Sequence, residues 1–260
     1  MKRATGWIPS PPDPKDWGIG KLVGSGVGAP ESSLILLPHI SFVADQELSE
    51  SCVLQAIQQQ HYLSQLHRGV AKPVRMSSLF SYYASRAQHG LAGADLGTIP
   101  RFAWKAIAGL GICSEATWPF SMDKVDTKPS LKAFREASDQ KWLEGYYSIL
   151  ETGSARVDAV KRALAAGYPI VFGMLIGKDF HNCKDGIYQV PNQVENSHMV
   201  CLVGYEPDFA WVISSWGSLW GTKPRSITKV SGGFAKISWD VISWDGAGDF
   251  WAATHAVEFI

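Results

Sequence analysis

A cysteine and a glutamine stand where nucleophilic catalysis could use both. Cys52 follows the polar stretch 45–51 and opens an apolar pattern with helical spacing, so we expect it in the first turn of a helix. The dipole and free amides of such a turn stabilise a thiolate. Gln46, six residues upstream, can bring its side-chain amide beside the Cys52 N–H, and two such donors would stabilise an oxyanion. Taken alone, Cys52 is explained equally well as a small buried hydrophobic residue.

A histidine and a tryptophan-rich turn offer the second half of such a site. His198 opens an apolar strand over 199–203, which places an ionisable ring at the end of a strand. The segment 213–221 follows another strand and contains two Trp–Gly pairs. In isolation, each piece favours a structural interpretation: a hydrogen-bonded strand-end histidine, and aromatic packing at turns. Together with Cys52 they indicate a Cys–His pair.

The other cysteines give no sign of a metal or cofactor. No two of the four cysteines form a C-x-x-C pair, and none has a histidine at zinc-ligand spacing, so we expect no metal site and no cofactor. We expect four free thiols, with two disulfides as the alternative. Cys201 lies in an apolar strand and is predicted to belong to the core, whereas Cys113 and Cys183 receive no role. His181 is predicted to be a surface histidine, with a place at the rim of the cleft as the alternative.

The composition argues against several classes of partner. The chain has 260 residues with 24 Lys+Arg and 24 Asp+Glu, and this balance favours neither nucleic acid nor an anionic membrane as a partner. An apolar fraction of 46% is typical of a packed globular protein. No apolar run is long enough to span a bilayer, and no apolar stretch follows the basic residues near the start. We therefore expect a protein that is cytoplasmic, or exported without a cleavable signal peptide.

Hydrophobic periodicity divides the chain into a helical half and a β-rich half. Helices are predicted over 52–67, 78–88, 99–109 and 154–166, and strands over 169–176, 199–203, 211–213, 234–237 and 252–260. This order predicts an α+β fold with a mainly helical lobe (41–140), a β-rich lobe (141–260) and a cleft between them.

Residues 1–40 differ from the rest of the chain. Prolines and glycines are frequent there, so we expect an extended arm rather than a domain. Trp7 and Trp17 are its candidate anchors, and we expect the arm to pack over or beside the cleft and to act as an intramolecular inhibitor.

In this order, the segments resemble the papain-like cysteine peptidases (clan CA, family C1), in particular bacterial members with a short N-terminal arm instead of a long helical propeptide. The segments that carry the resemblance are Gly6–Pro9 with Asp13–Trp17, Asp45-Gln46 with Ser51-Cys52, Leu79–Arg86, Gly111–Phe120, Gly186–Tyr188, His198 with Val203-Gly204-Tyr205, Ser215-Trp216-Gly217 and Trp220-Gly221.

The resemblance implies a fold and a set of roles. The fold would be the two-lobe papain fold, with a helical N-terminal lobe and a β-barrel-like C-terminal lobe. Cys52 would be the nucleophile, His198 the general acid/base, and Gln46 with the Cys52 amide the oxyanion hole. Ser214 stands where the family has the asparagine that orients the catalytic histidine.

Three further residues would form the substrate site. By the same resemblance, Trp216 would shield the histidine from water. Gly97 would pair its backbone with an extended substrate. Met199, where the family prefers alanine, would narrow the pocket for the second residue before the scissile bond.

The chain also departs from the family beside the nucleophile. Glu50 replaces a glycine, and its carboxylate could raise the pKa of Cys52 or crowd the substrate backbone. Ser49 replaces a cysteine that usually forms a disulfide. The shorter reach of Ser214 compared with asparagine also predicts a looser hold on His198.

The expected function is hydrolysis of peptide bonds in a peptide or protein substrate through a Cys–His acyl-enzyme. Two alternatives remain open at the level of sequence. One is a protein deamidase or other acyl-transfer enzyme, in the manner of a bacterial effector, that uses the same Cys–His pair. The other, motivated by Glu50 and Ser214, is a catalytically compromised papain-fold binding protein.

Overall fold

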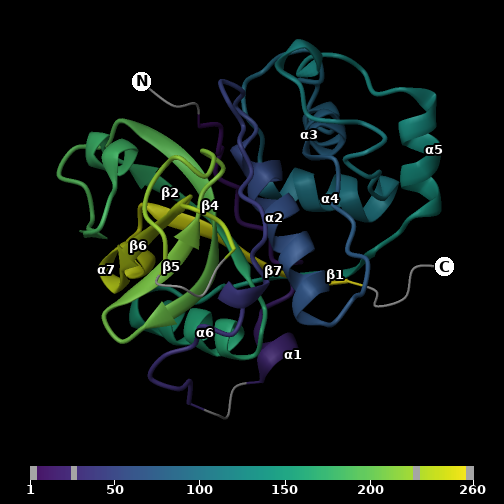
Figure 1. The fold of residues 1–260 in the computed structure, drawn as a ribbon. Coiled ribbons are helices and arrows are strands. Elements are labelled where there is room, and N and C mark those ends of the chain that lie inside the picture. The colour runs from purple at the N-terminus through teal and green to yellow at the C-terminus, as the bar shows by residue number, and fades with distance from the viewer. Residues whose placement is uncertain (1–4, 25–27, 225–228, 256–260) are drawn as a thin grey trace.

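The computed structural model describes residues 5–24, 28–224 and 229–255. Its helices are α1 (Gly20–Val23), α2 (Cys52–His67), α3 (Ser78–Ala87), α4 (Pro100–Leu110), α5 (Leu131–Asp139), α6 (Gly153–Ala165) and α7 (Trp239–Ser243), with short 3₁₀ turns η1 (Leu37–His39), η2 (Met122–Lys124) and η3 (Lys178–Asn182). Helices α2 to α5 gather on one side of the molecule, while α6 and α7 pack beside the strands (Figure 1).

The strands form one seven-stranded sheet in the order β1-β7-β2-β4-β5-β6-β3. They are β1 (Leu143–Ser148), β2 (Ile170–Ile176), β3 (Ile187–Tyr188), β4 (Asn196–Glu206), β5 (Phe209–Ile213), β6 (Phe234–Ser238) and β7 (Ala247–His255). The central pair β2 and β4 is antiparallel, and its register places Met174 opposite His198. This register fixes the position of His198 along β4 relative to β2.

The expected α+β two-lobe arrangement is confirmed. The predicted helices and the first four predicted strands match α2, α3, α4, α6, β2, β4, β5 and β6 with small shifts at their ends. The last predicted strand begins earlier, as β7 at Ala247, and residues 256–260 of that prediction lie outside the described residues. The sequence analysis missed α5, which buries only Ala133 and Ala137, and β1, which contains a glycine and few apolar residues.

Helix α2 is the central element of the fold. Almost all of it is buried, including glutamines that its periodicity assigns to a polar face. These side chains donate hydrogen bonds to backbone carbonyl groups of the surrounding segments. Gln60 reaches two of them, Pro169 O and Trp251 O, both at 2.8 Å. Gln60 therefore fastens the β-rich lobe onto the helix that begins with Cys52.

Candidate active site

Cys52 lies at the first residue of α2, as its sequence pattern predicts. Ser51 occupies the N-cap position, but its hydroxyl caps no backbone amide. It contacts the Ser49 hydroxyl at 2.6 Å and accepts a hydrogen bond from Gln55 instead. Cys52, Cys113 and Cys201 are fully buried, Cys183 is 9% exposed, and all four cysteines are free.

His198 is held by one serine and one tryptophan. Its Nε2 lies 3.1 Å from Ser214 Oγ, so the serine hydroxyl reaches the imidazole directly. The ring stacks on Trp216 at 4.4 Å between centroids and an interplanar angle of 21°. Nδ1 is buried and has no hydrogen-bond partner among the described residues. This leaves Nδ1 as the nitrogen available for exchanging a proton with another group.

His181 lies against the same tryptophan. Its ring is stacked on Trp216 at 5.0 Å between centroids and an interplanar angle of 9°, so the indole contacts both His181 and His198. His181 is therefore half-buried beside the site, which agrees with the expected alternative of a histidine at the rim of the cleft. The η3 turn brings the residue back over the tryptophan, which sequence spacing alone does not reveal.

Gln46 is fixed on both sides of its amide. Its Oε1 accepts a hydrogen bond from Ser215 Oγ at 2.5 Å, and its backbone N–H donates to Ser215 O. Its Nε2 donates to Ser49 O at 2.6 Å and to Thr5 O at 3.1 Å. One of the carbonyl groups that this amide binds therefore belongs to the N-terminal arm.

Burial keeps both members of the Cys–His pair uncharged in this state. Burial raises the pKa of the Cys52 thiol, the backbone amide of Met199 opposes this effect, and the charge of Glu50 adds to it. Burial, together with the nearby His181, lowers the pKa of His198 to about 3. The expected thiolate–imidazolium pair is thus disfavoured in this state, because the helix N-terminus does not outweigh the loss of solvent.

The N-terminal arm passes beside these residues, since Thr5 contacts Gln46 and Trp7 contacts Ser197, the neighbour of His198. Residues 5–10, which we call the cleft segment, lie against residues of both lobes. Thr98 donates its backbone N–H to Gly6 O and accepts one from Ile8 N on one side, while Ser197 Oγ donates to Trp7 O at 2.7 Å on the other. Figure 1 shows this purple segment passing between the helical side and the sheet.

Trp7 is the main anchor of the cleft segment. Its indole packs on Gly173, where a Cβ would overlap the ring, and its Nε1 donates to Asp249 Oδ2 at 2.9 Å. Asp249 also accepts a hydrogen bond from Ser10 N at 2.8 Å. Trp7 is 5% exposed and Trp17 is 53% exposed, so the anchor expected of Trp17 is wrong.

The remaining predicted site residues surround the cleft segment. Met199 is buried beside His198 and pairs with Gly173 across the sheet. Gly97 lies against Gly6, whose carbonyl oxygen leaves no space for a Cβ at position 97. The backbone hydrogen bonds to the cleft segment are made by Thr98, while the N–H of Gly97 donates to Tyr82. The structure thus gathers the sequence-predicted residues around one buried chain segment.

Several residues of this cleft have no sequence signal that points to it. In the sequence, Asp249 and Asp95 each lie in a glycine-containing stretch that is typical of an ordinary polar loop. Their places depend on the path of the cleft segment and on the packing of α3. No group of three or more histidine, cysteine or acidic side chains with the arrangement of a metal site occurs in the described part of the chain.

The sequence matches the family described as "Papain family cysteine protease" over residues 46–228. The chain belongs to this family. The match covers Gln46, Cys52, His198 and Ser214.

Relatives in the papain family have diverged widely from this chain. An uncharacterised peptidase C1-like protein of Acanthamoeba polyphaga mimivirus is 31% identical over 201 residues, which are 72% of this chain and 64% of that protein. A cathepsin B-like protein of Giardia intestinalis is 26% identical over 147 residues, which are 54% of this chain and 48% of that protein. The chain thus matches about half to two thirds of the length of these curated relatives.

Solved structures of papain-family enzymes share the fold. Xylellain, a cysteine protease from Xylella fastidiosa, superposes with a TM-score of 0.81 at 23% identity, covering 98% of each chain. Procathepsin B S9 from Trypanosoma congolense gives 0.73 at 18% identity, covering 98% of this chain and 87% of that one.

Proposed function

We propose that the protein is a cysteine peptidase that cleaves peptide bonds through a Cys52–His198 acyl-enzyme and that its arm restrains this activity. The observation that carries the proposal is the hydrogen bond from Gln46 Nε2 to Thr5 O. A peptide carbonyl is already bound by the side-chain amide that an oxyanion hole at Cys52 would use. The cleft therefore accepts an extended polypeptide.

The chemistry assigned to the pair follows from its contacts. His198 would take the Cys52 proton at Nδ1, since Nε2 is directed to Ser214. The thiolate would attack the scissile carbonyl, and the developing negative charge would be stabilised by Gln46 Nε2 and the Cys52 amide. His198 would return the proton to the leaving amine. In the second step the ring would take a proton from the attacking water and return it to the sulfur of Cys52, which releases the acyl group as an acid.

Release of the arm would prepare this pair. With the cleft segment in place, Cys52 and His198 are fully buried and a substrate carbonyl cannot reach Gln46. When the segment leaves, solvent enters and the effect of burial on both pKa values falls, so that proton transfer from the thiol to the imidazole becomes easier.

The first experiment tests the reaction. The full chain and its Trp7→Ala variant are incubated with a denatured protein and with fluorogenic peptides, with Cys52→Ala as the blank. New peptide termini that depend on Cys52 support a peptidase. Release of ammonia from glutamine without cleavage would instead assign the deamidase alternative, and the absence of both would favour the binding protein.

The second experiment tests the restraint with a matched pair of tryptophans. Trp7→Ala removes the buried anchor, and we expect Cys52 to react with iodoacetamide at least about tenfold faster, since the thiol becomes exposed. Trp17→Ala removes a half-exposed ring of the same arm and should leave the rate unchanged. Equal rates in the wild type and in Trp7→Ala would contradict the restraint.

A further inference from the structure

The cleft segment is tightest at Gly6, where two backbone segments of the helical lobe close on it. On one side is the carbonyl of Glu50, on the loop that leads into Cys52, and a Cβ on Gly6 would overlap that oxygen. On the other side is Gly97, where a Cβ would overlap the carbonyl oxygen of Gly6. The distance between Glu50 and Gly97 therefore decides whether an extended backbone fits between them.

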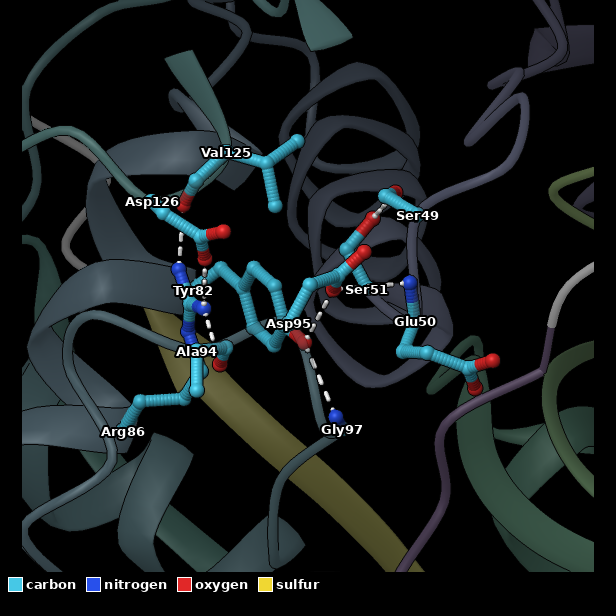
Figure 2. A network of polar contacts seen from close by, with 10 residues as sticks. All are labelled: Ser49, Glu50, Ser51, Tyr82, Arg86, Ala94, Asp95, Gly97, Val125 and Asp126. Carbon is cyan, nitrogen blue, oxygen red and sulfur yellow. Dashed lines mark hydrogen bonds and ion pairs between the residues drawn. The ribbon is translucent and has the colours of Figure 1, made fainter. Parts of the chain in front are cut away.

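A continuous chain of hydrogen bonds joins these two walls. Glu50 N–H donates to Asp95 Oδ1 at 2.9 Å, and Tyr82 Oη–H donates to the same oxygen at 2.7 Å. Tyr82 Oη in turn accepts the N–H of Gly97 at 3.0 Å. Figure 2 shows Asp95 and the Tyr82 hydroxyl lying between the two backbone amides. Each wall is thus tied to one side chain of the pair, and the two side chains are tied to one another.

Tyr82 and Asp95 are in turn held in place by buried contacts around α3. Tyr82 is fully buried on α3, and its ring lies 3.9 Å from the guanidinium of Arg86, which is also fully buried. Arg86 donates hydrogen bonds to the carbonyls of Ala94 and Val125 (Figure 2). Burial, and then the charge of Asp95, raises the pKa of Tyr82, so its hydroxyl remains a proton donor over the whole working pH range.

We propose that Tyr82 and Asp95 are positioning residues that set the width of the substrate groove by fixing Gly97 relative to the nucleophile loop at Glu50. The papain family usually has a disulfide beside this loop, but Ser49 stands at that position and all four cysteines are free. The hydrogen bonds of Asp95 and Tyr82 join this loop to Gly97 without a covalent link. This chain of hydrogen bonds consists of four polar groups rather than one covalent bond. Removal of a single oxygen atom is therefore enough to loosen the groove.

The proposal rests on the proposed function for its effect on substrate, but its first test does not need catalysis. The cleft segment already occupies the groove, so the exchange rates of the Ile8 and Thr98 amides report how firmly the groove holds a backbone. These rates are measured by hydrogen exchange in the full chain and in single variants of it.

Asp95→Ala and Tyr82→Phe each break the chain of hydrogen bonds, and we expect both amides to exchange about three- to tenfold faster. Asp95→Asn keeps an acceptor oxygen and should remain within about twofold of the wild type. Tyr83→Phe removes the same hydroxyl from the next residue of α3 and serves as the matched control. Amides in the core of β2 should keep their rates in every variant. Unchanged Ile8 and Thr98 rates in both Asp95→Ala and Tyr82→Phe would overturn the proposal.

The second test separates positioning from general stability. In a Trp7→Ala background, where the arm is loosened, Asp95→Ala should raise KM for a peptide about three- to tenfold and leave kcat within about twofold, with recovery in Asp95→Asn. A fall in kcat at unchanged KM would overturn the assignment. If the Trp7→Ala parent cleaves no peptide, the proposed function fails, while the exchange rates still decide the role of the pair.

Discussion

At the scale of single residues, the orientation of His198 depends on Ser214. The serine hydroxyl lies 3.1 Å from Nε2, within hydrogen-bonding distance, although its side chain is shorter than that of asparagine. Ser214 is almost completely buried, and Trp216 covers the ring. A single small hydroxyl can therefore fix the ring, because the backbone of position 214 comes close enough for it.

Removing that hydroxyl should slow turnover without weakening substrate binding. For Ser214→Ala in the Trp7→Ala background, we expect kcat to fall about tenfold or more with KM within about twofold, because His198 loses its orientation and not its contact with substrate. Steady-state kinetics on a fluorogenic peptide measure this, with Cys52→Ala as the blank. An unchanged kcat would show that the ring is oriented by Trp216 alone.

At the scale of elements, helix α2 joins Cys52 to the sheet through buried side-chain amides. The two hydrogen bonds of Gln60, to Pro169 O and Trp251 O, connect the middle of α2 to β7 and to the residue that precedes β2. Both carbonyls would lose a buried hydrogen-bond donor if the amide were removed.

Gln60→Ala is therefore expected to lower the free energy of unfolding by about 2–3 kcal/mol. Urea unfolding of the full chain, followed by tryptophan fluorescence, measures the change. The matched control is Gln189→Ala, since this glutamine is exposed and should change the value by less than about 0.5 kcal/mol. Equal effects of the two substitutions would show that the lobes do not depend on Gln60.

Strand β2 also accommodates the arm, because Gly173 leaves space for the indole of Trp7. Gly173 has an ordinary backbone conformation, but a Cβ there would overlap the indole of Trp7. Gly173→Ala should therefore expel the ring and increase the rate of Cys52 alkylation at least about threefold. Gly186→Ala, at an exposed glycine with space for a Cβ, is the control and should have no effect. A wild-type rate for Gly173→Ala would mean that β2 yields to the methyl group.

At the scale of the whole molecule, buried histidines make the fold sensitive to acid. Burial lowers the pKa of His198 and of His255, each to about 3, and lowers that of His61 well below its usual range. His61 and His255 face one another with their Nδ1 atoms 3.1 Å apart, so one of them must present an unprotonated nitrogen. Charging any of the three rings is therefore unfavourable in the folded state.

The direction of the pH effect follows from these lowered values. Below about pH 6.5 these histidines bind protons in the unfolded chain but stay neutral in the folded chain. Their contribution to the free energy of unfolding is therefore complete above that pH and is lost as the pH falls towards 3. Each histidine contributes up to about 1.4 kcal/mol per pH unit in this window. We expect the urea midpoint to be constant from pH 7.5 to 8.5 and to fall steadily between pH 6.5 and 4.5. A midpoint that does not change over the acidic range would contradict the assignment of these rings as buried and neutral.

None of the helices in the described part of the chain has the length and apolar character needed to cross a membrane. The N-terminal arm is also attached to the helical lobe outside the cleft. Arg101 on α4 forms an ion pair with Asp16 and donates to Pro11 O, so the arm is fastened beyond the cleft as well as inside it.

The sequence by itself determined the fold class and the pieces of the site. Periodicity placed Cys52 at a helix start and His198 in a strand, because these local patterns depend on burial of one face of each element. The order of the motifs pointed to the papain family, to which the chain belongs.

Only the tertiary structure decided how these pieces are used. The neutral state of Cys52 and His198 depends on their burial in the folded chain, and the positions of Asp95, Asp249 and His181 depend on which distant segments meet them. Even the glutamines of α2 belong to the interior because carbonyl groups of other segments satisfy their amides. Solvent exclusion and hydrogen-bond partners are set by contacts between residues far apart in the chain, and local sequence patterns carry no record of them.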